Sequence, residues 1–186
     1  MNFKKYLFTL TIALVVVSQT FAGDFYWVGN SGDWNDASHW ATQSGGKGGI
    51  LVPSAADNVF IDNKSFKSRN SVITINSSIA VHNLTISALE SNFTIKSNKQ
   101  TEINIYGSVL VSSKFENQIH STLRFKSNNI ETIHLGWFVW KSDIYFEGNG
   151  TYKLTSPIQN HNAALHHVSG VLDLNYNDVL SGDFIS

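Results

Sequence analysis

Hydrophobic and polar residues alternate in short runs along most of the chain, and Thr101–Ser112 shows the pattern most clearly. Ile103 and Ile105 in this stretch are separated by single polar residues, which is the two-residue period of a β-strand with one buried face. Gly107 interrupts the run, and Val109–Val111 resumes it. The stretch therefore predicts two short strands joined at a glycine.

The same unit recurs along the chain at steps of about 20 residues, at the lower end of the periods that indicate stacked repeats. A first series of apolar runs comprises Leu84–Ile86, Ile103–Ile105, Leu123–Phe125, Ile144–Phe146 and Leu165–His167. A second series, with less even steps, comprises Phe93–Ile95, Val109–Val111, Ile133–Leu135, Tyr152–Leu154 and Leu172–Leu174. Turn-forming residues separate the runs, and no amphipathic helix is evident after Ala22. The pattern predicts an all-β fold, a β-solenoid.

Residues 58–186 are expected to form about five or six coils of this solenoid, because a single coil cannot bury its apolar face and stacked coils share one core. The segment Trp137–Trp140 interrupts the fourth repeat, either as a third strand of that coil or as an apolar loop over one side. The pattern is still running at Ser181–Ser186. We therefore expect either the leading part of a longer repeat protein or a last coil that pairs with a partner, including end-to-end self-association.

Residues 23–57 differ in composition, and we expect them to cap the first coil. Asp24–Trp40 is the densest aromatic stretch, and a Gly/Ser-rich loop, Ala41–Gly49, follows it. Stacked strands expose unpaired backbone at the end of the stack, so a terminal coil needs a cover. The rings of Trp27, Trp34 and Trp40 are suited to that role. Exposed tryptophans also stack on sugar rings, which is the alternative interpretation.

Met1–Ala22 is predicted to be a secretory signal peptide. Lys4 and Lys5 precede an apolar core, Tyr6–Val17, that is shorter than the roughly 20 residues of a membrane-spanning helix. Cleavage near Ala22 leaves no second hydrophobic segment, so no membrane span is expected in the mature chain. The predicted location is secreted or on the outer cell surface.

Composition excludes several classes of function. Only 15% of the 186 residues are charged, against roughly 25% in a typical domain, and the formal net charge is -1. Nothing in this balance is a basic footprint for nucleic acid. The chain has no cysteine, which excludes disulfides, thiolate metal sites and a cysteine nucleophile.

Two groups of residues invite a metal site, and neither is predicted to form one. Asp33 and Asp36 lack the spacing of a calcium loop and are expected to form turns through their side chains. His166 and His167 are adjacent on a strand and therefore point to opposite faces, and His161 has no carboxylate at a suitable offset. No metal or other cofactor is expected.

Asp143 and Glu147 are the nearest pair of carboxylates for a polysaccharide-active enzyme. Four positions apart on a strand, they lie on one face at a separation of roughly 13 Å. That exceeds the range of about 5–9.5 Å for paired glycosidase carboxylates. No catalytic residues are predicted.

The segment Tyr26–Asp62 resembles the opening motif of large secreted, adhesin-like surface proteins of Gram-negative gliding bacteria, and more loosely the passenger starts of autotransporter adhesins. The matching positions are Trp27, Gly29, Gly32, Trp34, His39, Trp40, Gly45–Gly49, Pro53, Asp57, Asn58 and Val59. The later phrase Ile103–Val111 is similar to a repeat of the first family. The resemblance implies a right-handed parallel β-helix exported by a type IX secretion route, acting as an adhesin or structural stalk.

These observations together predict an exported, non-enzymatic scaffold of adhesin type, with glycans or cell-surface proteins as partners. A carbohydrate-binding module is the first alternative, and a polysaccharide-active β-helix enzyme is the second. The aromatic residues predicted either to cap the fold or to contact glycans are Trp27, Trp34, Trp40, Trp137 and Trp140.

Overall fold

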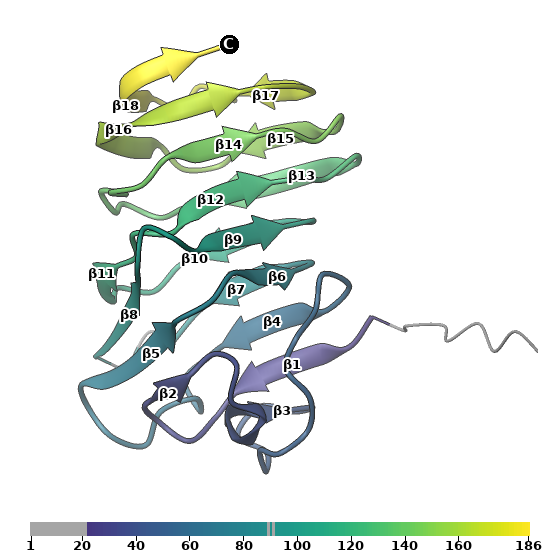
Figure 1. The fold of residues 1–186 in the computed structure, drawn as a ribbon, viewed down its shortest axis with the longest axis vertical. Helices are drawn as coiled ribbons and strands as arrows, with labels where there is room; N and C mark the ends of the chain where they lie inside the picture. Colours follow the sequence, from purple (N-terminus) through teal and green to yellow (C-terminus); the bar gives the residue numbers. More distant parts are fainter. Residues whose placement is uncertain (1–21, 89, 91) are drawn as a thin grey trace, which may run out of the picture.

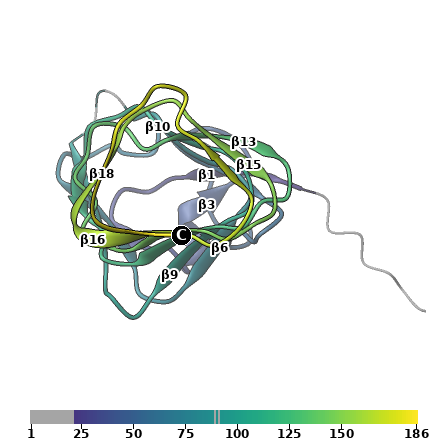
Figure 2. The same ribbon diagram turned by 90° about the horizontal axis from the view of Figure 1, so that it is seen from above.

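Three sheets run along one axis in the computed structural model, which describes residues 22–88, 90 and 92–186 (Figure 1). The strands of successive coils pair in parallel, apart from one short antiparallel pair at the N-terminal end. Viewed from the C-terminal end, the chain winds counter-clockwise as it rises toward the viewer (Figure 2). The predicted fold, a right-handed parallel β-helix, is confirmed.

The early coils contribute a strand to every sheet, and each sheet is named by its number of strands. The eight-stranded sheet contains, in order, β17 (Val171–Asp173), β15 (Thr151–Leu154), β13 (Ile130–His134), β10 (Val109–Val111), β7 (Leu84–Ile86), β4 (Asn58–Ile61), β1 (Asp24–Trp27) and β3 (Trp40–Ala41). The four-stranded sheet contains β11 (Glu116–Gln118), β8 (Phe93–Ser97), β5 (Ser71–Ile75) and β2 (Gly32–Asp33). The six-stranded sheet contains β18 (Val179–Ile185), β16 (Ile158–His167), β14 (Ile144–Phe146), β12 (Thr122–Phe125), β9 (Glu102–Ile105) and β6 (Ile79–Val81). The helix η1 (Ala37–His39) is a single 3₁₀ turn.

The core is a set of ladders in which each apolar side chain lies on its counterpart in the next coil. The parallel register of the six-stranded sheet places Ile103 beside Leu123 and Leu123 beside Ile144, all of them buried. At the next inward position of these strands, the rings of Phe125 and Phe146 stack with centroids 4.9 Å apart. The period-2 pattern of the sequence causes this arrangement, because alternate residues of every strand point inward.

The coils differ in length, and the structure corrects the two sequence series at their first members. Leu84–Ile86 pairs with Val109–Val111 in the eight-stranded sheet, so it belongs to the second series. The strand below Ile103–Ile105 is Ile79–Val81. Phe93–Ile95 belongs to neither series, because it lies in the four-stranded sheet. The early coils have a third strand that the two-series interpretation omitted.

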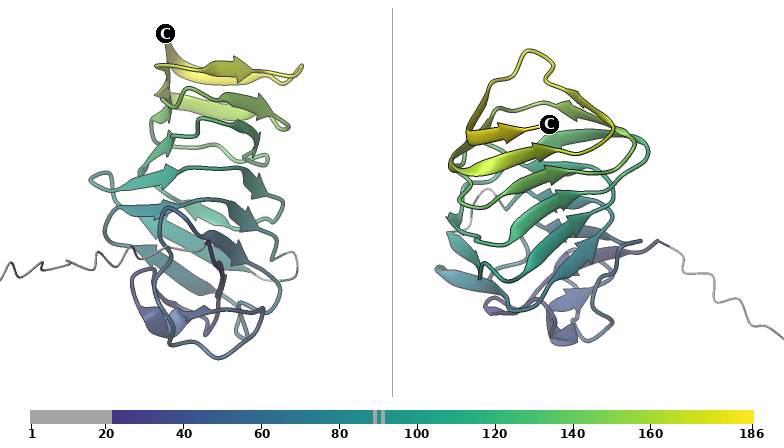
Figure 3. Two further views of the ribbon diagram at one scale, coloured as in Figure 1. Left: turned by 90° about the vertical axis from the view of Figure 1, so that its right-hand side faces the viewer. Right: turned by 45° about the horizontal axis from the view of Figure 1, so that its top comes forward.

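The later coils lose the separate third strand and become shorter. The coil that leads from Val59 to its partner Leu84 is longer than the coil that leads from Tyr152 to its partner Leu172. In the coil of β13 the four-stranded sheet is continued only by an isolated bridge between Val139 and Gln159. Trp137–Trp140 therefore supplies the third side of that coil, and Trp140 is buried in the core. Figure 3 shows the coils stacked one above another up to β18.

An aromatic cluster closes the N-terminal end of the interior, as predicted. Trp27, Trp34 and Trp40 are buried, with Trp40 edge-on to both of the others at centroid distances of 5.1 and 4.8 Å. Trp34 lies against the first interior ladder, beside Ile61 and Ile75. The cluster covers apolar surface that the first coil leaves open, which is the role of a terminal cap.

The two predicted turn-forming carboxylates hold the loops of this cap. Asp33 Oδ1 accepts a hydrogen bond from the Asn35 backbone N–H at 2.8 Å, and Asp36 Oδ1 accepts one from Ser38 at 2.9 Å. The backbone bond from Ser38 is the main reason that the pKa of Asp36 lies below its ordinary value. Both residues therefore act through the Asx turns expected from the sequence.

The predicted signal peptide, apart from Ala22, lies outside the described residues. Among residues 22–88, 90 and 92–186, no helix is long and apolar enough to span a membrane.

Candidate functional site

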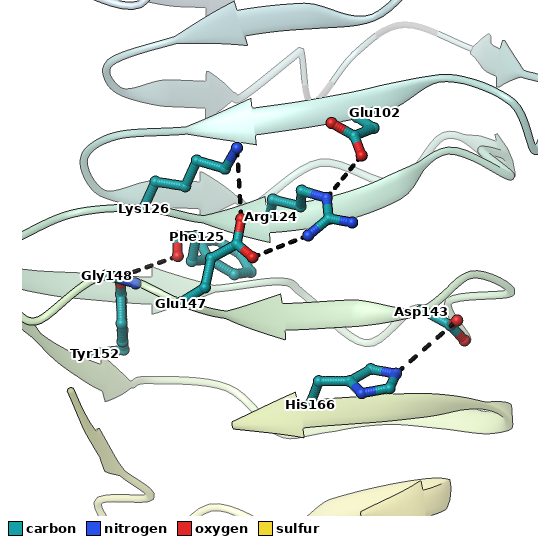
Figure 4. A network of polar contacts seen from close by, with 9 residues as sticks. All are labelled: Glu102, Arg124, Phe125, Lys126, Asp143, Glu147, Gly148, Tyr152 and His166. Atoms are coloured by element: carbon teal, nitrogen blue, oxygen red, sulfur yellow. Dashed lines mark hydrogen bonds and ion pairs between the residues drawn. The ribbon is translucent and has the colours of Figure 1, made fainter. Parts of the chain in front are cut away.

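Two outward-facing surfaces combine polar, charged and aromatic side chains. The first is the ionic face of the six-stranded sheet, defined by Glu102, Arg124, Lys126, Glu147 and the ring stack beside them (Figure 4). The second is an axial groove at the corner that leads into the four-stranded sheet, marked by Asn70, Asn92, Lys114 and Trp137. The geometry of each surface determines which chemistry or binding it supports.

Arg124 is the centre of the ionic face and bridges three successive coils. Its Nε lies 2.8 Å from Glu102 Oε1 in the preceding coil, and its Nη1 lies 2.9 Å from Glu147 Oε2 in the following coil (Figure 4). Lys126 Nζ lies 3.4 Å from the other oxygen of Glu147. Burial lowers the pKa of Arg124, but its bonds to Glu102 and Glu147 outweigh burial and raise it.

A stack of rings continues this face toward the C-terminal coils. The Arg124 guanidinium carbon lies 4.3 Å from the centroid of the Tyr145 ring, within the range of a cation–π contact. The rings of Tyr145 and His166 stack 4.0 Å apart and nearly parallel, at 4°. The register of β12, β14 and β16 forces this order, because the three residues occupy the same outward position of consecutive strands.

The carboxylates of this face are occupied by partners within the fold. Both oxygens of Glu147 are paired with Arg124 and Lys126. Asp143 accepts a hydrogen bond from the Ala164 N–H at 2.9 Å, and its other oxygen lies 4.0 Å from His166 Nε2. Asp143 and Glu147 bind different groups on either side of β14, and no donor or base among the described residues connects them. The ionic face therefore ties consecutive coils together.

The axial groove lies over a column of phenylalanine rings. Phe66, Phe93, Phe115 and Phe138 come from consecutive coils, and their centroids are separated by 4.6, 5.4 and 4.6 Å along the column. The first three are buried and Phe138 is half-buried. Each ring lies on the side of its coil that carries the four-stranded sheet, or in the turn just before that side. The column forms an apolar floor along the solenoid axis.

Polar side chains stand along this floor, one from each coil. Asn70 and Asn92 are neighbours, since the Asn70 N–H donates to the Asn92 carbonyl oxygen at 2.9 Å and the next residues, Ser71 and Phe93, are paired. Thr94 pairs with Glu116, so two positions earlier along each chain segment Asn92 lies opposite Lys114.

The groove consists of two hollows that meet. A hollow of about 380 Å³ is lined by Asn70, Asn92, Phe93, Thr94, Lys114, Phe115 and Glu116. A second, of about 480 Å³, is lined by Val111, Ser112, Ser113, Lys114, Phe115, His134, Gly136, Trp137 and Phe138. They share Lys114 and Phe115. The result is one depression that follows the axis across several coils.

Trp137 forms the C-terminal end of the groove, and its turn is anchored on both sides. Gly136 has a positive φ of 69°, and a Cβ there would lie 3.0 Å from the Val111 carbonyl oxygen, so the position favours glycine. The N–H of Leu135 donates to Ser156 Oγ at 2.9 Å, and that of Trp140 donates to the Gln159 carbonyl at 2.7 Å. The indole itself is 77% exposed. A fixed backbone thus presents a large aromatic ring to solvent.

Ser113 lies beneath the same hollow. The residue is only 2% exposed, and its Oγ is buried with no hydrogen-bond partner among the described residues. It alternates with the buried Val111 and Phe115, so its hydroxyl is closed off from a ligand in the hollow.

The structure separates the five aromatic residues singled out from the sequence. Trp27, Trp34, Trp40 and Trp140 are buried in the cap and core, whereas Trp137 is exposed in the axial groove. The groove's other residues, Asn70, Asn92 and Lys114, were not identified from the sequence. The equal spacing of these three residues along the chain was the available signal.

The three histidines considered for metal binding lie in different surroundings. His161 is exposed, His166 stacks on Tyr145, and His167 Nε2 lies 3.2 Å from the Gly170 carbonyl oxygen. Within the described ranges, no group of three or more His, Asp or Glu side chains is arranged to hold a metal ion.

Comparison of the chain with family models, with curated proteins and with solved structures gives no match in any of the three.

Proposed function

We propose that this chain is a non-enzymatic scaffold of adhesin type, belonging to an exported or surface protein. The observation that carries the proposal is the continuity of contacts between coils on both the inside and the outside of the solenoid. Inside, buried ladders join each coil to the next. Outside, Arg124 alone links three coils through Glu102 and Glu147. Such a rod resists bending and presents side chains at fixed spacing, which suits a stalk or a display surface.

The charged groups support a scaffold over an enzyme. Catalytic acids and bases need accessible positions next to a bound substrate and a protonation state matched to the reaction. Glu147 is held by two cations, and Asp143 is held by a backbone N–H. Using Glu147 for proton transfer requires breaking the contacts that join β12 and β14.

An export experiment and an adhesion experiment test the proposal. In the organism that makes the protein, antibodies against the described region should label intact cells or the culture medium. Beads coated with the purified protein should bind the producer's cells or their extracellular matrix, while beads coated with a heat-denatured sample should not. Cytoplasmic location, or failure of the coated beads to bind any of these surfaces, would contradict the scaffold proposal.

A polysaccharide-active enzyme is the rival that the same material can test. Incubation of the purified protein with acidic polysaccharides should release no shorter products. Product release that is lost on Glu147→Gln, with the fold intact, would replace the scaffold proposal by an enzymatic one.

A further inference from the structure

We infer that the axial groove binds an acidic polysaccharide, with one sugar ring stacked on Trp137 and a carboxylate of the sugar paired with Lys114. This inference deepens the proposed function, on which it rests, by naming the ligand class and the place where the scaffold holds it. The groove comprises the two hollows that share Lys114 and Phe115.

The shape of the groove fits an extended chain better than a compact ligand. It runs along the solenoid axis and receives one outward side chain per coil: Asn70, Asn92, Lys114 and then Trp137. Neighbouring coils are about 4.8 Å apart, the spacing of hydrogen-bonded strands. That repeat is similar to the length of one sugar unit in an extended polysaccharide. Successive sugars can therefore meet successive coils in the same relative position.

The chemistry of the lining fits sugars. The exposed indole of Trp137 and the edge of Phe138 offer an apolar surface to the face of a pyranose ring. The amides of Asn70 and Asn92 provide both donors and acceptors for hydroxyl groups.

The charges of the lining favour an acidic sugar at the Trp137 end. Lys114 is exposed and forms no ion pair with any described residue. Glu116, the acidic residue of the groove, lines the other hollow together with Lys114, and its oxygens accept hydrogen bonds from Thr94 and Gln118. His134 lines the Trp137 hollow and adds no negative charge. A carboxylate beside the stacked ring thus meets Lys114 without a competing anion of the same hollow.

The groove is also formed before a ligand arrives. The Trp137 turn is fixed by Gly136 and by the hydrogen bonds at Leu135 and Trp140, and its floor rests on the packed rings of Phe115 and Phe138. A binding site that needs little ordering loses less conformational entropy when it binds.

Titration of the purified protein with oligogalacturonate, followed by calorimetry and tryptophan fluorescence, tests the inference. The same oligomer with its carboxylates methyl-esterified is the matched neutral probe. The acidic form should bind more tightly, and added salt should weaken it, because the pair with Lys114 is exposed. Trp137→Ala should reduce affinity for both forms by about tenfold or more, as expected for an aromatic anchor. Lys114→Gln should remove the preference for the acidic form.

Two control variants separate the groove from general effects. Lys141→Gln removes an exposed lysine outside the groove, and Tyr176→Ala removes an exposed ring on the last coil. Both should bind as the unaltered protein does.

Equal binding of the acidic and esterified oligomers, or binding unaffected by Trp137→Ala and Lys114→Gln, would overturn the inference. If neither oligomer binds while coated beads still adhere, the acidic-polysaccharide inference fails and the scaffold proposal stands. If the oligomer binds at the groove and is cut, the non-enzymatic proposal fails and the groove remains a sugar site.

Discussion

The indole N–H of Trp40 donates a hydrogen bond to the backbone carbonyl oxygen of Trp34, 2.7 Å away, inside the aromatic cap. This single bond joins β3 to the loop that places Trp34 over the first interior ladder. The cap is thus held by a directional contact as well as by the packing of its rings.

Replacing Trp40 by Phe should destabilise the protein, because it removes this donor and part of a fully buried ring. The expected loss in free energy of unfolding is about 2–4 kcal/mol, combining an unpaired buried carbonyl with lost apolar burial. Urea unfolding followed by circular dichroism measures it. Trp137→Phe is the matched control and should change stability by no more than about 0.5 kcal/mol, since that ring is exposed. Equal losses in the two variants would contradict a structural role for the cap.

Tyr152 supplies a second buried contact between coils, and Tyr152→Phe tests it. The hydroxyl accepts a hydrogen bond from the Gly148 N–H at 3.0 Å, and the carbonyl oxygens of Phe125 and Ser127 are also 3.0 Å away (Figure 4). The ring is fully buried, so the variant leaves an unpaired N–H and should lose about 1–3 kcal/mol of stability.

Tyr176→Phe is the control for Tyr152→Phe, because the Tyr176 side chain is fully exposed. The pH dependence provides a further check. Burial raises the pKa of Tyr152 above its ordinary value of 10.0. A raised pKa in the folded state means that stability is complete below pH 10 and is lost as the pH rises beyond it. The phenylalanine variant should lose less stability over that alkaline range, and an identical slope in both proteins would count against the assignment.

Asp57→Asn should remove a contribution to stability that is present at neutral pH and is lost in acid. Burial raises the pKa of Asp57, but hydrogen bonds from the Ser54 hydroxyl, the Gly23 N–H and the Ser54 N–H outweigh it, and the net pKa lies below 3.8. A lowered pKa stabilises the fold above pH 3.8, and the stabilisation disappears as the pH falls through the folded-state value. At pH 7 we expect a loss of about 1–3 kcal/mol in the variant.

The difference between Asp57→Asn and the unaltered protein should shrink as the pH falls from 5 to 2, because protonation removes the same interactions from the unaltered protein. Urea midpoints at several pH values measure this. Asp178→Asn, at an exposed loop position, should show no such convergence. A constant difference at all pH values would mean that the Asp57 charge does not matter.

A double-mutant cycle on Arg124 and Glu147 tests whether the ionic face joins the coils. The two groups are about three-quarters buried and lie 2.9 Å apart, so a coupling of about 0.5–1.5 kcal/mol is expected, weakened by salt. The single variants Arg124→Ala and Glu147→Ala should unfold at lower urea than the unaltered protein. A coupling near zero at low salt would show that the face contributes no stability.

The fold class could be predicted from the sequence because the alternation of apolar and polar residues is local. Ile103 and Ile105 indicate a half-buried strand without any knowledge of their neighbours in space. The tryptophans of the cap were also recognisable, since they cluster ahead of the repeating apolar runs.

The register and the groove could not be obtained in the same way. Coil lengths vary, so a fixed step of about 20 residues assigned Leu84–Ile86 and Phe93–Ile95 to the wrong columns. The step from Phe93 to Val109 is the shortest in its series, and that irregularity was the sign of a missing third strand. The groove depends on Asn70, Asn92 and Lys114 meeting across coils, and the pairings of β5 with β8 and of β8 with β11 bring that side of the solenoid into register.

The unequal coils have a consequence for how the molecule can vary. The long coil between Val59 and Leu84 and the shorter one between Tyr152 and Leu172 both start and end in the eight-stranded sheet, so the corners absorb the difference while the strands keep their places. Lengthening a corner loop therefore leaves the neighbouring coils undisturbed, whereas shifting a strand by one position turns its apolar side chains outward. The corner loops can therefore vary in length and sequence one at a time, whereas the buried positions of the strands tolerate little change.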